Sequence, residues 1–185
     1  NASKTALTWR KYLDEQYANG IWNTNACPIV IRYAEVLLTY AEAVNELSGP
    51  SADVYDKLDL IRGRVGMPKV DREKYASKET LRRLIRRERG VELAGEGVRR
   101  ADILRWKDDN GKMVAETVLN GVLERVVGTV NYAETDPTKR AEIDTNAPAT
   151  DKKIEDRVFK VHNRYNPIPQ GAIDNNPNLE QNPGY

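Results

Sequence analysis

The chain has 185 residues, a length that fits one domain with a hydrophobic core of moderate size. Hydrophobic residues make up 39% and charged residues 31%, which excludes a disordered chain, and no run approaches the roughly 18 apolar residues of a membrane span. With 29 basic and 28 acidic residues the net charge is +1, which argues against a dedicated nucleic-acid-binding protein, because such proteins carry a clear basic excess.

The chain contains one cysteine and one histidine, which limits the chemistry it can support. Cys27 cannot form an intrachain disulfide, and beside Pro28 we expect it to be a small buried residue. With His162 as the only histidine, the chain lacks the residues for a histidine-based metal site or a Cys–His dyad. We therefore expect no bound metal and no cofactor.

The first segment, residues 3–28, is polar and rich in aromatic side chains, with turn-forming Asn and Gly residues between them. We expect a short strand or irregular segment and an exposed loop. Asn1 and Ala2 are interpreted as a remnant of tag cleavage. The domain is therefore expected to cover residues 3–185 and to derive from a longer protein whose N-terminal part is not included.

The next part of the chain predicts two consecutive helices. In residues 29–48 apolar residues recur at three- and four-residue spacing, and Gly49 ends the pattern. Ser51 is a good N-cap for a second helix, which closes before Pro68. Two helices joined by such a tight turn form a helical hairpin, and this one has about the length of one tetratricopeptide repeat.

Further helices are predicted after this hairpin. Ser77 is a good N-cap for a third helix, which runs to about residue 94. A short fourth helix is expected at about 98–107, and residues 112–119 are compatible with another short helix.

The last third of the chain is less regular. Segments 124–132 and 156–165, in which valines alternate loosely with polar residues, are compatible with a short β-hairpin or with extended surface segments. Residues 165–185 contain four prolines and are expected to form an extended C-terminal tail of loops and turns. The predicted fold class is therefore mainly α, with tetratricopeptide-like helical hairpins and irregular loops.

Residues 81–106 are rich in arginine, and their helical pattern suggests why. The apolar positions on one face of this helix are Leu81, Leu84, Ile85 and Val91. Glu88 and Glu92 lie on the same stripe, four residues apart, where like charges repel. Each carboxylate therefore needs a cationic partner, because an unpaired buried charge costs several kcal/mol. Candidate partners are Arg32, Arg62, Arg64, Arg99 and Arg105.

Three interpretations of this stretch compete. The favoured one is an internal scaffold of ion pairs. A second is a nucleic-acid-binding face made by Arg82, Arg83, Arg86 and Arg87. A third is a catalytic carboxylate pair formed by Glu88 and Glu92, although no histidine, metal-ligand cluster or nucleophile accompanies them.

Several segments together resemble the C-terminal domain of SusD/RagB proteins. The resemblance rests on PIVIRYAEVLLTYAEAVNEL at 28–47, IRGRVG at 61–66, LRRLIRRERGVELAGEGVRRADILRW at 81–106 and NPIPQGAIDNNPNLEQNPGY at 166–185. The order and spacing of these segments agree with the family over nearly the whole chain. Gly95 stands where the family usually has an aromatic residue, and Ala172 where it often has glutamate. We expect both departures to affect local packing only.

The resemblance implies a function and a location. SusD-like proteins are outer-membrane lipoproteins on the surface of glycan-consuming bacteria. They bind oligosaccharides or other nutrients, deliver them to a SusC-type TonB-dependent transporter, and are not enzymes. The lipidated cysteine lies at the N-terminus of the mature parent, so Cys27 is not that residue. The parent is thus expected to face outward from the outer membrane through its lipid anchor, and the fragment itself is expected to be soluble.

Sugar-binding sites commonly stack aromatic rings on the apolar faces of pyranose rings, while polar side chains fix the orientation. The first segment offers glycan-binding candidates, namely Trp9, Tyr12, Tyr17, Trp22, Asn23 and Asn25. We expect a glycan contact at Trp22 or Trp9; the alternative is that both tryptophans pack on the N-terminal part of the parent. Trp106 matches a structural tryptophan of the family and is assigned to the core.

Two other classes of function stay open at this point. The helical hairpin is also typical of a protein–protein interaction module, which would have no ligand site of its own in this fragment. A glycosidase would need two carboxylates roughly 5–10 Å apart in an open cleft. That reading fails if Glu88 and Glu92 are buried and each is paired with arginine.

Overall fold

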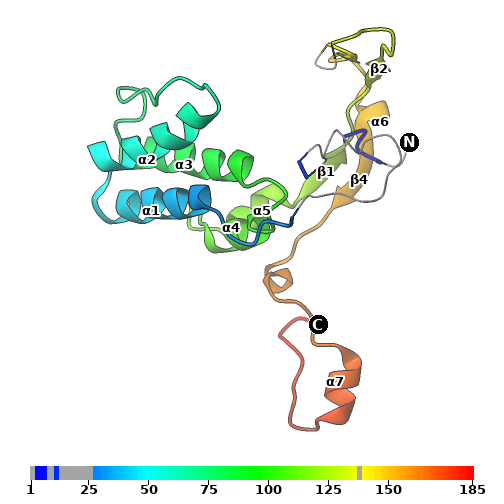
Figure 1. Ribbon diagram of the computed structural model, residues 1–185. Helices are drawn as coiled ribbons and strands as arrows, with labels where there is room; N and C mark the ends of the chain where they lie inside the picture. The colour runs from blue at the N-terminus through cyan, green and yellow to red at the C-terminus, as the bar shows by residue number, and fades with distance from the viewer. Residues whose placement is uncertain (1–2, 8–10, 13–26, 137–138) are drawn as a thin grey trace. The chain divides into compact units, whose positions relative to one another are not determined.

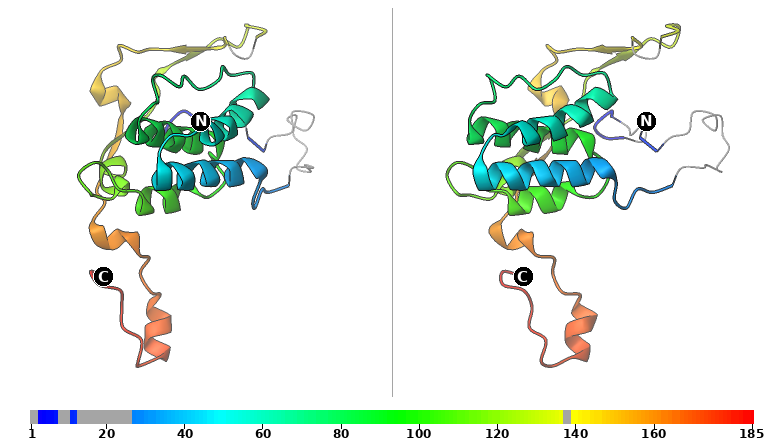
Figure 2. Two further views of the ribbon diagram at one scale, coloured as in Figure 1. Left: turned by 90° about the vertical axis from the view of Figure 1, so that its left-hand side faces the viewer. Right: turned by 60° about the vertical axis from the view of Figure 1, so that its left-hand side comes forward.

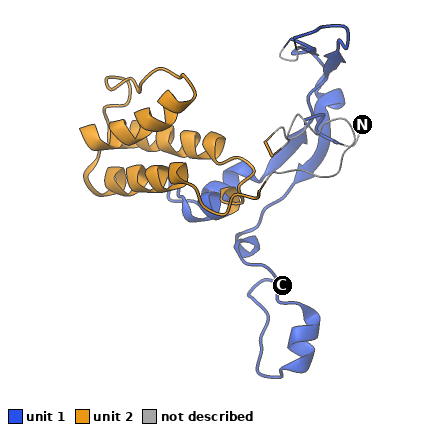
Figure 3. Ribbon diagram, viewed as in Figure 1, with its two compact units in different colours: residues 1–9, 101–185 blue, residues 10–100 orange. Residues whose placement is uncertain are grey.

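The structure of the chain, a computed structural model, describes residues 3–7, 11–12, 27–136 and 139–185. The chain divides into two compact units (Figure 3). Residues 10–100 form the helical unit, and residues 1–9 with 101–185 form the strand unit. Helices dominate the regular structure, as predicted (Figure 1).

The helical unit consists mainly of α1 (Tyr33–Ser48), α2 (Ala52–Arg64) and α3 (Lys78–Glu92), which lie side by side in both views of Figure 2. The predicted N-caps are confirmed, because Ser51 Oγ accepts a hydrogen bond from the Val54 N–H (3.3 Å). Likewise, Ser77 Oγ accepts from the Thr80 N–H (3.2 Å). The three-residue connection after Ser48 brings α2 back against α1, as expected for a helical hairpin.

The start of the first helix differs from the prediction. α1 begins at Tyr33, four residues later than expected, because the backbone of Arg32 is extended (φ −138°, ψ 161°). This places Arg32 just outside the helix, where its side chain can reach the end of α3.

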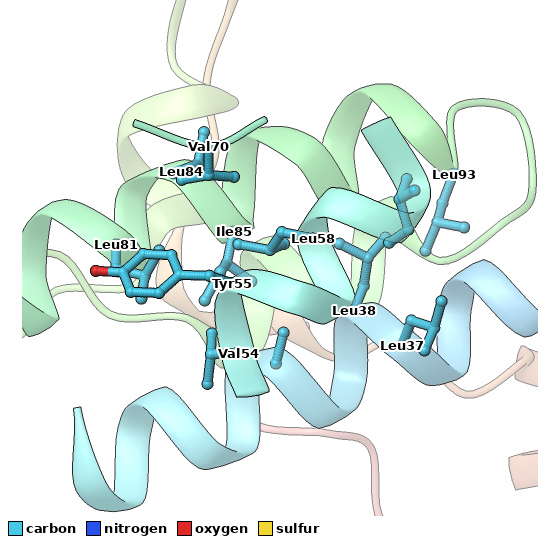
Figure 4. Close-up of a cluster of buried hydrophobic side chains, with 12 residues drawn as sticks. Leu37, Leu38, Val54, Tyr55, Leu58, Val70, Leu81, Leu84, Ile85 and Leu93 are labelled. Carbon is cyan, nitrogen blue, oxygen red and sulfur yellow. The ribbon is translucent and has the colours of Figure 1, made fainter. Parts of the chain in front are cut away.

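The hydrophobic core of the helical unit lies where α1, α2 and α3 meet (Figure 4). Its members are Leu37, Leu38, Ala41, Val54, Tyr55, Leu58, Ile61, Val70, Leu81, Leu84, Ile85 and Leu93. Apolar residues of all three helices meet in this core, as predicted, although other apolar residues of α1 are exposed and Val91 is an exception on α3. Val91 is 72% exposed, whereas the nearby Arg89, a charged residue, is buried.

The strand unit contains short elements. Beyond α4 (Arg99–Arg105), which crosses the boundary between the units, these are α5 (Val114–Val118), β1 (Gly121–Glu124), β2 (Gly128–Val130), β3 (Ala141–Ile143), α6 (Ala149–Lys152) and β4 (Lys153–Arg157). Trp106, assigned to the core from the sequence, is 3% exposed.

Segments 124–132 and 156–165, for which the sequence left a short hairpin or extended surface segments open, contribute in part to two strand pairs. β1 pairs with β4, and β2 pairs with β3, both antiparallel. Along the sequence the second pair therefore lies between the two strands of the first. Gly128 allows β2 to approach β3, since a Cβ there would lie 2.3 Å from the Glu142 carbonyl oxygen. Alternating valines usually indicate a strand with one buried face. In this unit they do not, because β1, β2 and β3 are largely exposed.

The C-terminal tail is not purely loop, contrary to the prediction. It contains the helix α7 (Gln170–Asn175) and follows directly on the 3₁₀ helix η2 (Val161–Arg164). The side-chain amide of Gln181 accepts from the Ile168 N–H (2.8 Å) and donates to the Ile168 carbonyl (3.0 Å), as a paired strand would. Tyr185 Oη donates to the Tyr165 carbonyl (2.9 Å), so residues 165–185 close into a loop on themselves.

Candidate functional site

Most of the predicted glycan contacts lie outside the described residues. These are Trp9, Tyr17, Trp22, Asn23 and Asn25, whose role in binding stays a prediction. Tyr12 is described and is 37% exposed. The neighbouring Lys11 Nζ donates to the backbone carbonyls of Glu92 (3.1 Å) and Ala94 (3.0 Å), which places this part of the first segment against the end of α3.

Arg32 joins the two carboxylates at the end of α3. Its Nε donates to both carboxylate oxygens of Glu96 (2.9 and 2.8 Å), and its Nη1 donates to Glu92 Oε1 (2.5 Å). Its Nη2 donates to the Glu92 backbone carbonyl (2.5 Å), one of the groups that a helix C-terminus leaves unpaired. All three nitrogens of this guanidinium are engaged, so it fixes the start of α1 to the end of α3.

Helix α2 supplies two further arginines to the same face of α3. Arg62 forms an ion pair with Glu88, and both side chains are largely buried (13% and 15% exposed). Arg64 Nη2 donates to both carboxylate oxygens of Glu92 (2.8 and 3.0 Å). Both glutamates on the predicted stripe are thus paired with arginine, as the interpretation of an internal scaffold requires.

The hydrogen bonds of this network also set the ionisation of Glu96. Burial alone raises the pKa of the Glu96 carboxyl, but the hydrogen bonds from Arg32 and Lys11 outweigh it and hold that pKa below its ordinary value. In the same way, the hydrogen bond with Glu96 raises the pKa of Arg32, although burial acts against it. Glu96 therefore stays ionised to a lower pH than an unperturbed glutamate does.

Other arginines of the stretch 81–106 are also used within the helical unit. Arg82 binds the carboxylate of Glu46 on α1 through Nε (2.5 Å) and Nη2 (2.6 Å). The buried Arg89 donates from Nη1 to Thr39 Oγ1 (2.9 Å), also on α1. These contacts disfavour a nucleic-acid-binding face built on Arg82.

Some residues of this region departed from the prediction or escaped it. Cys27 is exposed, since it lies in the extended segment before α1 and outside the core. Val91 sits in the last turn of α3 and is exposed, although Leu93, which follows it, is buried in the core. Arg89 lies four residues after Ile85 and faces α1, so an i, i+4 count could have found it. Glu96 follows a helix end, where periodicity gives no signal.

A hollow of about 370 Å³ lies between α1 and α2, next to the network. Its lining residues are Arg32, Tyr33, Ala34, Leu37, Leu60, Ile61 and Arg64. Leu37 and Ile61 are buried and form its apolar base, whereas Tyr33 is 70% exposed. This volume lies in the range of small-molecule sites, which are typically apolar with a few polar groups.

A second hollow of about 370 Å³ lies on another face of α1. Its lining residues are Ile31, Glu35, Val36, Thr39, Tyr40 and Ala43. The aromatic and aliphatic side chains Tyr33, Val36, Tyr40 and Leu47 along α1 are 44–85% exposed. A helix with apolar residues both toward the core and away from it is usually covered on both sides.

Within the part of the chain that the structure describes, no group of histidine, cysteine, aspartate and glutamate side chains is arranged to hold a metal ion. Nor does any helix of that part combine the length and the apolar character that crossing a bilayer requires.

Comparisons with known proteins relate the chain to SusD-like proteins. SusD-like protein P25 of Formosa agariphila is 40% identical over 79 residues, which cover 42% of this chain and 15% of that protein. SusD-like protein P2 of the same organism is 38% identical over 93 residues, which cover 48% of this chain and 18% of that protein. The chain thus matches only a minor part of the length of these relatives.

The fold is similar to a solved structure as well. A crystal structure of a SusD-like protein from Bacteroides fragilis superposes with a TM-score of 0.63 at 28% identity, covering 85% of this chain and 26% of that one. The sequence profile of the SusD family matches residues 1–185. The chain therefore belongs to the SusD family.

Proposed function

We propose that this chain is the C-terminal domain, residues 3–185, of a cell-surface protein that binds an oligosaccharide as a nutrient. The observation that supports this proposal is the match to the SusD family over residues 1–185. In the proposed arrangement the parent is a lipoprotein on the outer face of the outer membrane. It delivers its ligand to a SusC-type TonB-dependent transporter.

The proposed role is binding without catalysis. The pairing of Glu88 with Arg62, and of Glu92 with Arg32 and Arg64, supports it. A glycosidase needs one carboxyl group that donates a proton to the leaving group. The carboxylate oxygens of Glu88 and Glu92 are instead taken up by arginine side chains, which leaves them poorly placed to reach a leaving group.

The proposal can be tested by calorimetric titration of the full-length parent with a panel of oligosaccharides. We expect at least one of them to bind, and we expect Trp22→Ala to weaken binding at least about fivefold, as loss of an aromatic contact worth ~1 kcal/mol would do. Tyr132→Ala serves as a control, because Tyr132 is an exposed aromatic residue (84%) of the strand unit.

The outcomes separate the function from the site. If no oligosaccharide binds, the proposed function is wrong. If one binds but Trp22→Ala leaves its affinity unchanged, Trp22 is not part of the site. Co-purification of the parent with a TonB-dependent transporter from detergent-solubilised membranes would test the proposed partner.

A helical protein–protein interaction module is a second candidate function. It is favoured by the exposed apolar side chains along α1, among them Val36 (53%) and Tyr40 (44%). Val36→Glu should then abolish association of the parent with its transporter while leaving oligosaccharide affinity unchanged. Retained association with this variant would contradict a docking role for this face.

A further inference from the structure

Arg64, at the edge of the hollow between α1 and α2, uses only part of its hydrogen-bonding capacity. Its Nη2 makes both bonds to Glu92 (2.8 and 3.0 Å). Among the described residues, no acceptor lies within hydrogen-bonding reach of its Nε or Nη1, and the side chain is 58% exposed. Arg32 differs, because all of its nitrogens are bound to Glu92 and Glu96. The guanidinium of Arg64 is thus held in place with N–H groups to spare.

The network around Arg64 also carries an excess of positive charge. In its ion pairs three cations, Lys11, Arg32 and Arg64, meet two carboxylates, Glu92 and Glu96. The carboxyl end of α3 adds a partial negative charge, but its carbonyls accept their hydrogen bonds from Lys11 and Arg32. Arg64 shares Glu92 with Arg32 and is the most exposed of the three cations, so it is the one best placed to meet a further anion.

The remaining lining of the hollow suits the apolar face of a ring. Leu37 and Ile61 form the base, and the exposed Leu60 (57%) and Tyr33 (70%) stand at its sides. A ligand that fits would have a ring with an apolar face and one negatively charged substituent. Carbohydrate rings with a carboxylate have this chemistry.

We propose that the hollow between α1 and α2 binds an acidic saccharide, with its carboxylate on the free N–H groups of Arg64 and its ring against Tyr33. The identification of the ring as a sugar rests on the proposed function. The negative charge of the ligand is inferred from the N–H groups of Arg64 at the hollow. This site is separate from the aromatic residues of the first segment.

The proposal can be tested by titrating the ¹⁵N-labelled chain with trigalacturonate and following its amide signals and the Arg64 Nε–H signal by NMR. We expect shifts at Tyr33, Ala34, Leu60 and Arg64, and none there with the neutral trisaccharide maltotriose. Arg64→Gln should weaken binding about tenfold, as expected for the loss of a hydrogen bond to a charged group.

Two further variants serve as controls for this experiment. Arg72→Gln should leave binding unchanged, because Arg72 has similar exposure (53%) and a similar partner, Asp56, but does not line the hollow. If Arg64→Gln loses its dispersed spectrum, Arg64→Lys replaces it, and its single nitrogen should again weaken binding.

The alternative outcomes each have a defined meaning. Absence of shifts at the hollow, or unchanged affinity in Arg64→Gln, overturns the inference. In that case binding of maltotriose elsewhere on the chain would leave the proposed function intact. Benzoate serves as a control, because it is an anionic ring that is not a sugar. If benzoate binds at the hollow and trigalacturonate does not, the assignment to a saccharide is overturned.

Discussion

At the scale of single residues, Glu88 and Glu92 illustrate how a helix can carry two like charges on its inner face. Being one turn apart, they would destabilise an isolated helix. In the folded chain Arg62 binds the first, and Arg32 and Arg64 bind the second. The arginines come from α2 and from the segment before α1, so the pairs connect all three helices.

Replacing Glu88 by alanine should therefore destabilise the helical unit. The change leaves the largely buried Arg62 (13% exposed) without its partner, and we expect a loss of about 1–3 kcal/mol in the free energy of unfolding. The measurement is urea unfolding followed by circular dichroism. Asp56→Ala is the matched control and should cost less than about 0.5 kcal/mol, since its pair with Arg72 is exposed. An unchanged midpoint for Glu88→Ala would contradict the scaffold.

At the scale of elements, α1 has two different apolar faces. Leu38 is fully buried between the helices, whereas Leu47, on the same helix, is 85% exposed. Periodicity counts both residues as apolar, but only packing against α2 and α3 gives Leu38 its stabilising role.

The pair offers a test within one helix. Leu38→Ala should lower the free energy of unfolding by about 2–5 kcal/mol, because it removes a buried side chain and leaves a cavity. Leu47→Ala should change it by less than about 0.5 kcal/mol. Thermal and urea unfolding of both variants would check this, and similar losses for the two would mean that the exposed face of α1 is covered in solution.

The C-terminal loop, residues 165–185, depends on a close contact at its end. Gly184 has φ +97°, and a Cβ there would lie 2.7 Å from the His162 side chain, whose ring packs edge-on against Tyr185 (4.9 Å). We expect Gly184→Ala to open the loop and to speed hydrogen exchange at the Ile168 amide. Gly171→Ala in α7 is the control, because its Cβ would meet open space. Equal protection of Ile168 in both variants would show that this contact does not close the loop.

At the scale of the whole molecule, the ion-pair network makes stability depend on pH. The folded-state pKa of Glu96 lies below its unfolded value, so at acidic pH the unfolded chain binds more protons than the folded one. The contribution of Glu96 is fully present above its unfolded pKa, about 4.3. It is lost as the pH falls through the lower folded-state pKa.

This sign leads to a measurable difference. The free energy of unfolding of the natural sequence should exceed that of Glu96→Gln at pH 7, and the gap should narrow toward pH 3. Urea unfolding of both proteins at the two pH values would test this. Curves that stay parallel between pH 7 and pH 3 would contradict the role assigned to the Glu96 carboxylate.

Features that depend on neighbouring residues could be predicted from the amino-acid sequence. The caps at Ser51 and Ser77, the helical hairpin and the apolar stripe of α3 through Leu81 and Ile85 follow from local hydrogen bonds and helical spacing, and the structure confirms them. The charge balance also indicated that the arginines of residues 81–106 serve the protein itself.

The pairing of each arginine with its carboxylate, and of each strand with its partner, became known only from the packing of the folded chain. Arg32 reaches Glu92 and Glu96 from about sixty residues away in the chain. β1 pairs with β4, although β2 and β3 lie between them in the sequence and form a separate sheet. Arg64 borders the hollow because α1 and α2 pack together there. Such contacts depend on the packing of distant segments, whose partners no local pattern specifies.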